Sequence, residues 1–267
     1  MKRLFDKYGL TKTLLVAGII SAAIGWVYYS WYYQSLPQAA IYVLNSVPNP
    51  VARERILVFS PHPDDETLAA GGYMATAEQN GASVWIALVT NGDRRGLEYA
   101  RYSEFIKATG TLGVPESHLF FLGYPDGGLS KIPQASFEKN LQNIVNEVNP
   151  NIIIAPDPKD YNKDHSIIGQ TIEKITAGKG KTIYYYIIHY PHFPLPQSYD
   201  PNSYILPPLR LMGSREDWRK FIVSPYTEAI KKNAILEYKS QLANPFLQSL
   251  LLGMIRENEL FVVVNRG

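Results

Sequence analysis

A short apolar run that ends in a proline-rich acidic motif is the feature that most limits how this chain can fold. Residues Ile56 to Phe59 are typical of a buried strand, and Pro61-His62-Pro63-Asp64-Asp65-Glu66 follows them after one serine. Proline has no N–H to donate to a sheet and restricts the residue before it, so the strand stops there. A helix is expected to begin at Glu66. In an open α/β sheet, ligands bind beyond the carboxyl ends of the strands, so the motif lies where a site is expected.

The rest of the chain repeats this alternation. Strand-like runs cover residues 55–59, 84–90, 119–122, 152–155 and 182–188, with helical stretches between them, and a further helix over 227–244 precedes a final strand over 260–264. Alternating strands and helices predict an α/β fold with a mostly parallel sheet flanked by helices. Residues 54–267 are enough for one such domain.

The residue types in the motif suggest a metal site. An imidazole nitrogen and a carboxylate are ordinary zinc ligands, and a catalytic zinc usually has three protein ligands and one open position. His62 and Asp65 supply two ligands. Asp64 could then act as a general base on a water molecule activated by the metal. The simpler alternative is that this acidic turn only caps the next helix.

A third ligand is expected at the end of another strand on the same sheet edge, and His165 fits. It follows the apolar run 152–155 and the segment Pro156 to Asp164, and it directly precedes an expected helix from Ser166. His165 thus has the same topological position as His62. With Asp65 the two histidines form a two-histidine, one-carboxylate set.

The other histidines compete less well. His118 precedes the strand 119–122, which is the wrong end, and we interpret it as a surface or packing residue. His189 follows the strand that ends at residue 188, so it faces either the site or the core. His192 is expected in a loop.

The motif resembles the signature of the LmbE-like, or PIG-L, family of metal-dependent de-N-acetylases. The order of that family continues through the following segments: Thr90-Asn91-Gly92-Asp93, Arg101 and Glu104 before Leu112-Gly113-Val114, the run from Leu122 to Leu129, and Asp164-His165. The resemblance spans roughly residues 53–170 and implies a Rossmann-like fold. It also implies a Zn²⁺ ion held by His62, Asp65 and His165, with Fe²⁺ left open as the physiological ion, and Asp64 as the base.

The resemblance further implies removal of an acetyl group from the 2-amino nitrogen of a glucosamine unit. Arg101 and Asp126 match positions that contact the sugar in relatives. Without the resemblance, an (i, i+3) surface pair between Arg101 and Glu104 would be the simpler interpretation. Asp164 is expected either to orient a ligand or the base through a hydrogen bond, or to cap the following helix.

One position departs from the family pattern. Many relatives carry a histidine where this chain has Asn162. Asparagine can donate a hydrogen bond to a developing oxyanion but cannot act as an acid near neutral pH. Asn162 and His189 are therefore the candidates to stabilise the oxyanion. The proton donor is His189, Tyr161 or Asp64 acting twice, and Tyr161 is also a candidate substrate contact.

The N-terminal part predicts a membrane anchor. Residues 13–52 hold no charged side chain, and residues 13–33 are apolar enough to span a bilayer. Basic residues dominate positions 1–12, which predicts a cytoplasmic N-terminus and an extracytoplasmic domain beyond a proline-containing linker over 34–53. A cleaved signal peptide is the alternative.

Composition excludes some functions. The net charge is +2, and no basic patch with interleaved aromatics points to nucleic acid. The absence of cysteine excludes disulfides and thiolate ligands. Six prolines between Pro191 and Pro208 predict an irregular loop over the site, whose aromatic residues either stack on sugar rings or pack the loop down.

The sequence thus predicts a single-pass, membrane-anchored, zinc-dependent hydrolase. Its predicted reaction is removal of an N-acetyl group from an N-acetylglucosamine-containing glycan or lipid-linked sugar. Two alternatives stay open: a metal-dependent hydrolase of another amide or ester, and a non-catalytic glycan-binding module.

Overall fold

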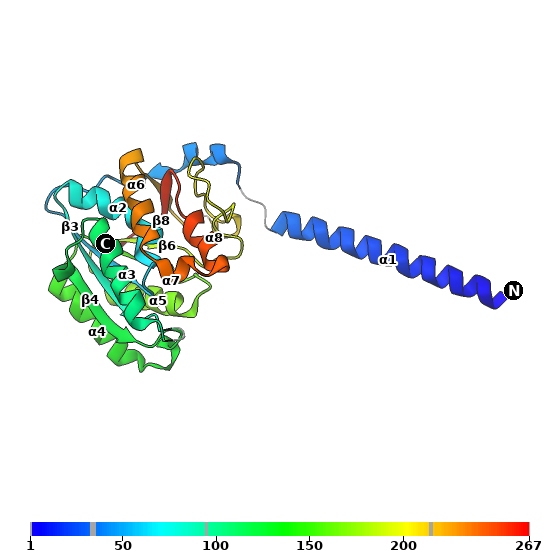
Figure 1. Cartoon of the computed structure of the whole chain (residues 1–267), viewed down its shortest axis with the longest axis horizontal. Helices are drawn as coiled ribbons and strands as arrows, with labels where there is room; N and C mark the ends of the chain where they lie inside the picture. The colour runs from blue at the N-terminus through cyan, green and yellow to red at the C-terminus, as the bar shows by residue number, and fades with distance from the viewer. Residues whose placement is uncertain (1, 33–35, 94–95, 214–215, 267) are drawn as a thin grey trace. The chain divides into compact units, whose positions relative to one another are not determined.

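The chain forms two compact units, one within residues 1–35 and the other from Leu36 onward. The structure, a computed structural model, describes residues 2–32, 36–93, 96–213 and 216–266 (Figure 1). The first unit is helix α1 (Lys2–Tyr32). Within it, Gly9–Ser30 is long and apolar enough to cross a membrane, and none of this segment is buried. A helix of this kind fits an anchor or a signal sequence. Positions 33–35 of the predicted anchor and linker lie outside the described residues.

The second unit is built on one sheet, which contains eight strands in the described part of the chain. Their order across the sheet is β1-β7-β8-β6-β5-β2-β3-β4. The strands are β1 (Asn45–Ser46), β2 (Arg55–Ser60), β3 (Ser83–Thr90), β4 (Leu119–Tyr124), β5 (Ile152–Pro156), β6 (Lys181–Tyr186), β7 (Trp218–Ile222) and β8 (Asn258–Arg266). The pairs from β4 through β6 are parallel, and β8 runs antiparallel to β6 and β7. The predicted α/β fold with a mostly parallel sheet is confirmed.

Strand β2 lies in the middle of the sheet, and its position explains its composition. Residues Ile56 to Phe59 are fully buried because helices cover both faces of the sheet. From β2 the chain builds β3 and β4 on one side, and later β5 and β6 on the other side. The strand order therefore reverses between β2 and β5, and the crevice beyond their carboxyl ends is where such folds bind ligands.

The helices cover the two faces of the sheet. α2 and α3 contact α6, whereas α4 contacts α5, and α5 packs on β5 (Figure 1). The helices of this unit are α2 (Asp65–Gln79), α3 (Glu98–Thr111), α4 (Gln134–Val148), α5 (Lys163–Thr176), α6 (Pro225–Leu236), α7 (Lys239–Leu242) and α8 (Pro245–Gly253). Short 3₁₀ turns add η1 (Gln38–Val43), η2 (Glu116–His118), η3 (Leu129–Lys131) and η4 (Leu209–Leu211).

Three details differ from the sequence prediction. Residues 36–53 belong to the compact unit, because Ile41 and Val47 are buried and β1 pairs with β7 at the sheet edge. The predicted helix 227–244 is divided into α6 and α7, and α8 follows. Helix α5 begins at Lys163, so His165 lies inside its first turn instead of before it.

Candidate metal centre and active site

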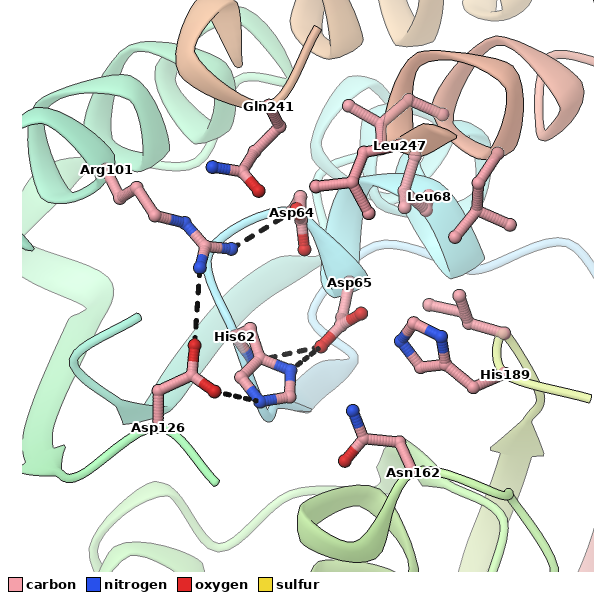
Figure 2. A pocket seen from close by; sticks show the side chains of 13 residues that line it. His62, Asp64, Asp65, Leu68, Arg101, Asp126, Asn162, His189, Gln241 and Leu247 are labelled. Atoms are coloured by element: carbon pink, nitrogen blue, oxygen red, sulfur yellow. Dashed lines mark hydrogen bonds and ion pairs between the residues drawn. The ribbon is translucent and has the colours of Figure 1, made fainter. Parts of the chain in front are cut away.

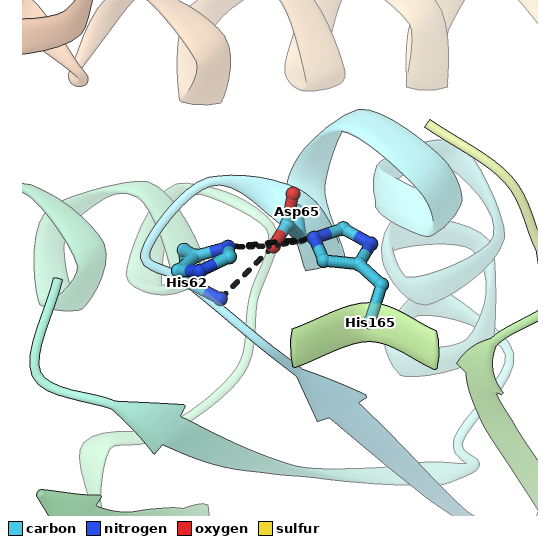
Figure 3. A group of neighbouring side chains, drawn as sticks. All are labelled: His62, Asp65 and His165. Carbon is cyan, nitrogen blue, oxygen red and sulfur yellow. Dashed lines mark hydrogen bonds and ion pairs between the residues drawn. The ribbon is translucent and has the colours of Figure 1, made fainter. Parts of the chain in front are cut away.

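Three predicted ligands converge at the reversal of strand order. His62 lies in the turn after β2, Asp65 is the first residue of α2, and His165 is in the first turn of α5 (Figure 3). The exposed fractions of these residues are 7%, 2% and 0%, respectively. Residues 103 positions apart in the sequence thus meet because β2 and β5 are neighbours that end at the same sheet edge.

The spacing of the ligand atoms fits a tetrahedral metal ion. Asp65 Oδ2 lies 3.1 Å from His62 Nδ1 and 3.0 Å from His165 Nε2, and the two nitrogens are 3.4 Å apart. In a tetrahedral zinc site with bonds of about 2.0–2.1 Å, neighbouring ligand atoms lie about 3.3 Å apart. The same two-histidine, one-carboxylate set also suits Fe²⁺.

The pKa values of the two histidines also support a metal ion at this position. Burial lowers the pKa of His165, but Asp65 and Asp160 outweigh it and raise that pKa to about 10. Burial also lowers the pKa of His62, and contacts with Asp164 and Asp65 raise it to about 9. Two protonated imidazoles whose nitrogens face each other at 3.4 Å repel. A single cation between the three atoms replaces both protons without that repulsion, so these residues fit a metal ion.

Asp160 contacts Nδ1 of His165, the ring nitrogen that does not face Asp65, and this residue was not identified from the sequence. Its Oδ2 lies 3.4 Å from His165 Nδ1 and accepts hydrogen bonds from the backbone N–H groups of Ile188 (3.0 Å) and His189 (3.1 Å). Its Oδ1 accepts a bond from Asn162 N at 2.8 Å. A carboxylate behind a ligating histidine fixes the ring orientation and raises its basicity. The signal in the sequence was the second of three acids between Pro156 and His165, which the pattern alone could not rank above Asp157 and Asp164.

Asp164 and Asp126 lie behind His62. His62 Nε2 is 3.5 Å from a carboxylate oxygen of each. Asp164 also accepts hydrogen bonds from Gly127 N (2.7 Å) and Leu129 N (3.2 Å), so it ties the loop after β4 to the site. The alternative that Asp164 caps α5 is wrong: Asn162 is the N-cap, and its side chain accepts from Asp164 N at 2.9 Å.

Asp64 points into the site from a strained backbone. Its φ is 142°, a region that favours glycine, and strain of this kind clusters at functional positions. It occupies the N-cap position of α2, yet its side chain makes no capping hydrogen bond, so the simple cap interpretation is wrong. Burial raises the pKa of Asp64 to about 8, although Arg101 opposes this effect.

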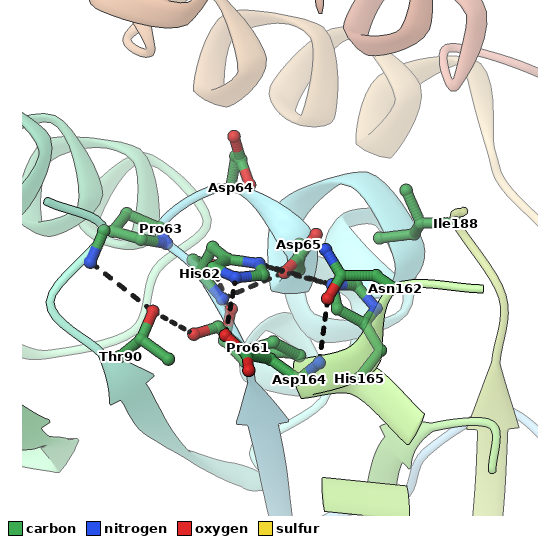
Figure 4. A network of polar contacts seen from close by, with 12 residues as sticks. Pro61, His62, Pro63, Asp64, Asp65, Thr90, Asn162, Asp164, His165 and Ile188 are labelled. Atoms are coloured by element: carbon green, nitrogen blue, oxygen red, sulfur yellow. Dashed lines mark hydrogen bonds and ion pairs between the residues drawn. The ribbon is translucent and has the colours of Figure 1, made fainter. Parts of the chain in front are cut away.

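The turn that carries these residues is fixed from several directions (Figure 4). The Thr90 hydroxyl donates to the carbonyl of Pro61 at 2.7 Å. Glu66 is buried and accepts hydrogen bonds from the Ser60 hydroxyl (2.7 Å) and from Asp64 N (3.3 Å). The Tyr238 hydroxyl donates to Glu66 as well. The rigid turn keeps the side chains of His62, Asp64 and Asp65 in place.

Arg101 is part of the site and not of the surface. It is 4% exposed, and its Nη2 lies 3.3 Å from Asp64 Oδ2 while its Nη1 lies 3.5 Å from Asp126 Oδ2. The same guanidinium donates to the carbonyls of Pro63 and Gly92, each at 3.0 Å. The alternative of a surface pair with Glu104 is wrong, because Glu104 instead accepts hydrogen bonds from the backbone and hydroxyl of Ser240.

The other predicted residues divide into two groups. Asn162 and His189 line the cavity beside His62 and Asp65 (Figure 2). The centroid of the His189 ring lies 4.7 Å from that of the His165 ring. Burial and His165 lower the pKa of His189 to about 4, so its imidazole is neutral near neutral pH. Tyr161 is 65% exposed, packs against Tyr190 and does not line the cavity. His118 stacks on Trp85, as a packing residue does.

The cavity also has walls that sequence reasoning missed, contributed by α7 and α8. Its lining consists of His62, Asp64, Asp65, Leu68, Arg101, Asp126, Asn162, Ile188, His189, Gln241, Leu247, Leu250 and Leu251 (Figure 2). No residue of 191–208, all of which the structure describes, is among them, so the prediction that this loop covers the site is wrong for this cavity. The loop packs down instead: Phe193 is buried, and Arg256 donates to the carbonyls of Pro196 and Asp200.

Comparison with known proteins agrees with this geometry. Residues 57–176 match the PIG-L family model, described as GlcNAc-PI de-N-acetylase. A probable N-acetyl-alpha-D-glucosaminyl L-malate deacetylase 2 of Bacillus anthracis is 26% identical over 135 residues, which cover 46% of this chain and 59% of the relative. A 1D-myo-inositol 2-acetamido-2-deoxy-alpha-D-glucopyranoside deacetylase of Mycobacterium sp. (strain KMS) is 27% identical over 157 residues, 45% of this chain and 50% of the relative. The match thus spans only half to three-fifths of these curated relatives.

A solved structure resembles most of this chain. The antimicrobial reagent A40926 pseudoaglycone deacetylase aligns with a TM-score of 0.62 at 19% identity, covering 80% of this chain and 99% of that one. At this identity the likeness concerns the fold.

Proposed function

We propose that this chain, which belongs to the PIG-L, or LmbE-like, family of de-N-acetylases, is a metal-dependent hydrolase that removes the acetyl group from an N-acetylglucosamine unit. The observation that carries the proposal is the convergence of His62, Asp65 and His165 at the edge of a cavity that His62, Asp65 and Asp64 line. The Bacillus and Mycobacterium relatives are named for the deacetylation of acetylated glucosaminides, which supports this substrate class.

His62, Asp65 and His165 would hold the metal ion, with zinc as the first choice. When bound, the ion supplies Lewis-acid polarisation of the amide carbonyl and lowers the pKa of a water molecule. Asp160 behind His165, and Asp164 behind His62, keep the two rings oriented toward the ion.

Asp64 is the proposed base. Its carboxylate removes a proton from the attacking water, and Arg101 holds it in place at 3.3 Å. The water oxygen bonds to the amide carbon, and the carbon–nitrogen bond then breaks. Asp64 returns its proton to the leaving nitrogen, so the products are acetate and a free amine. Asp64 is assigned this double role because Asn162 is no acid, Tyr161 lies outside the cavity, and the lowered pKa of His189, about 4, leaves its imidazole neutral.

Asn162 and His189 are the proposed donors to the oxyanion. The Asn162 side-chain oxygen already accepts a hydrogen bond from Asp164 N, and its amide nitrogen points to the side of the cavity where Asp65 lies (Figure 2). His189 is neutral and carries one N–H. Each N–H can stabilise the negative charge that develops on the carbonyl oxygen.

The test uses the full chain purified in detergent and a set of N-acetylglucosaminides with different aglycones. We expect equal amounts of acetate and free amine, loss of both with a chelator, and recovery when zinc is added back. Metal analysis should give about one zinc per chain. A zinc-loaded protein that releases no acetate from any of these substrates would overturn the proposal and favour a different amide or ester. A folded protein that binds no metal would favour a glycan-binding module.

We further propose that the apolar segment Gly9–Ser30 anchors the protein in the cell membrane, with a cytoplasmic N-terminus and an extracytoplasmic domain. The basic residues before this segment support that orientation. The mass of the mature protein distinguishes an anchor from a cleaved signal sequence, and a protease added to intact cells should digest the domain. A protein that resists the protease until the cells are broken would contradict the orientation.

A further inference from the structure

The two sides of the active-site cavity differ in chemistry. One side is polar and is formed by Asp64, Arg101, Asp126 and Gln241 (Figure 2). The other side is apolar and comes mainly from α8, with the following lining residues: Leu68, Ile188, Leu247, Leu250 and Leu251. Two of the proposed metal ligands, His62 and Asp65, lie between these two sides.

The substrate of an amide hydrolase has the same division. On one side of the scissile carbon–nitrogen bond is the amine part, here a sugar with several hydroxyls, and on the other side is the acyl part, which ends in a hydrocarbon group. A wall of leucine side chains cannot satisfy sugar hydroxyls, and burying them there without hydrogen bonds is costly. With the carbonyl held between Asp64 and the metal ligands, the sugar therefore faces the polar side and the acyl group faces α8.

The cavity is small. Its volume is about 80 Å³, roughly half of an engineered cavity of about 150 Å³ that holds benzene. Because the same cavity must also take the amine side of the amide, the part of it against α8 suits only a short acyl group. Leu247 and Leu250 are partly buried, whereas Leu251 is buried at 1% exposure, so the first two are the more exposed α8 residues of the apolar wall. The neighbouring Phe246 is 89% exposed, so the first turn of α8 borders solvent.

We propose that Leu247 and Leu250 of α8 contact the acyl group of the substrate and limit it to acetyl or a similarly short chain. This inference rests on the amide hydrolysis proposed above. The chemistry is unchanged along an acyl series: water adds to the acyl carbon, the carbon–nitrogen bond breaks, and a carboxylic acid and a free amine leave. Only the fit of the acyl tail against α8 changes.

The test compares N-acetyl, N-propionyl and N-butyryl derivatives of one glucosaminide, with the same free-amine assay for all three. For the wild type we expect kcat/KM to fall with each added methylene. Leu247→Ala and Leu250→Ala should each raise the butyryl-to-acetyl ratio of kcat/KM by roughly tenfold. Leu250→Phe should lower the propionyl-to-acetyl ratio, so the series includes changes in both directions.

Leu252→Ala is the matched control, because Leu252 is on the same helix and partly buried but does not line the cavity. Its acyl preference should equal that of the wild type. A wild type that releases amine, with an unchanged ratio in both alanine variants or an equal change in Leu252→Ala, would overturn this inference alone. A wild type that releases no amine from any derivative would overturn the proposed function and this inference with it.

Discussion

Replacing Asp160 with asparagine should weaken metal binding, although Asp160 is not a ligand. The carboxylate lies 3.4 Å from His165 Nδ1 and accepts three backbone N–H bonds, from Asn162, Ile188 and His189, at 2.8–3.1 Å. Asparagine has the same shape but offers one acceptor oxygen instead of two. Its amide nitrogen must face at least one of these N–H groups, so the loop shifts and His165 loses its anionic partner.

The expected loss of zinc affinity follows from the contacts that the Asp160 carboxylate makes. Removing an outer carboxylate partner of a metal-binding histidine typically costs about 10- to 100-fold in metal affinity, which corresponds to about 1.4–2.7 kcal/mol. We expect the upper end, because the substitution also breaks a backbone hydrogen bond to a charged group. Burial of the Asp160 side chain, which is 0% exposed, leaves no water to replace that bond.

Asp157→Asn is the matched control. Asp157 lies in the same loop and is 5% exposed, but its carboxylate accepts from Lys159 N at 2.7 Å instead of facing His165. The measurement is zinc affinity of the full chain in detergent, by competition with a chromophoric chelator, with circular dichroism to establish folding. A zinc Kd for Asp160→Asn within twofold of the wild type, or an equal loss in Asp157→Asn, would refute the reasoning.

Three further predictions concern the base, the metal and the core. Asp64→Asn should lower kcat by about 100-fold or more with an unchanged zinc Kd, and a parallel loss of zinc would make Asp64 a ligand instead of a base. A chelator should lower the urea midpoint of the folded chain, since ligand at 100 times its Kd stabilises by about 2.7 kcal/mol; an unchanged midpoint would contradict a metal in this site. Lys231→Met should destabilise by about 3–5 kcal/mol, because Lys231 and its partner Glu259 are 1% and 0% exposed at the side chain, 2.8 Å apart. A loss below about 1 kcal/mol in urea unfolding would contradict this last prediction.

The metal ligands could be predicted because they depend on topology. In a parallel sheet the carboxyl ends of neighbouring strands meet at one edge, so polar residues after two buried apolar runs come together whatever the loops do. His62 and His165 follow β2 and β5, which pair directly. The buried runs themselves, with four consecutive apolar residues in β2, are clear in the sequence.

The walls of the cavity could not be predicted, since they depend on tertiary packing. The apolar run Leu250 to Leu252 is typical of any buried helix, and nothing local places it opposite the metal ligands. Arg101 and Glu104 have the spacing of a surface pair. Only the packing of α3 gives them different partners, Asp64 in the site for Arg101 and Ser240 of α7 for Glu104. Strand β1 has two residues, too few for any periodic signal.

The strained backbone of Asp64 supports a catalytic role for this residue of the sequence motif. A non-glycine residue at a φ of 142° costs about 1–3 kcal/mol and persists only where its surroundings over-determine it. Here Arg101 binds the Pro63 carbonyl and the Asp64 carboxylate, Thr90 binds the Pro61 carbonyl, and Glu66 accepts from Asp64 N. An aspartate that served only as a helix cap would need none of these contacts, because its carboxylate would turn back to the first N–H groups of α2. Here these four contacts instead hold the Asp64 carboxylate in the cavity. A base beside a metal centre requires this arrangement.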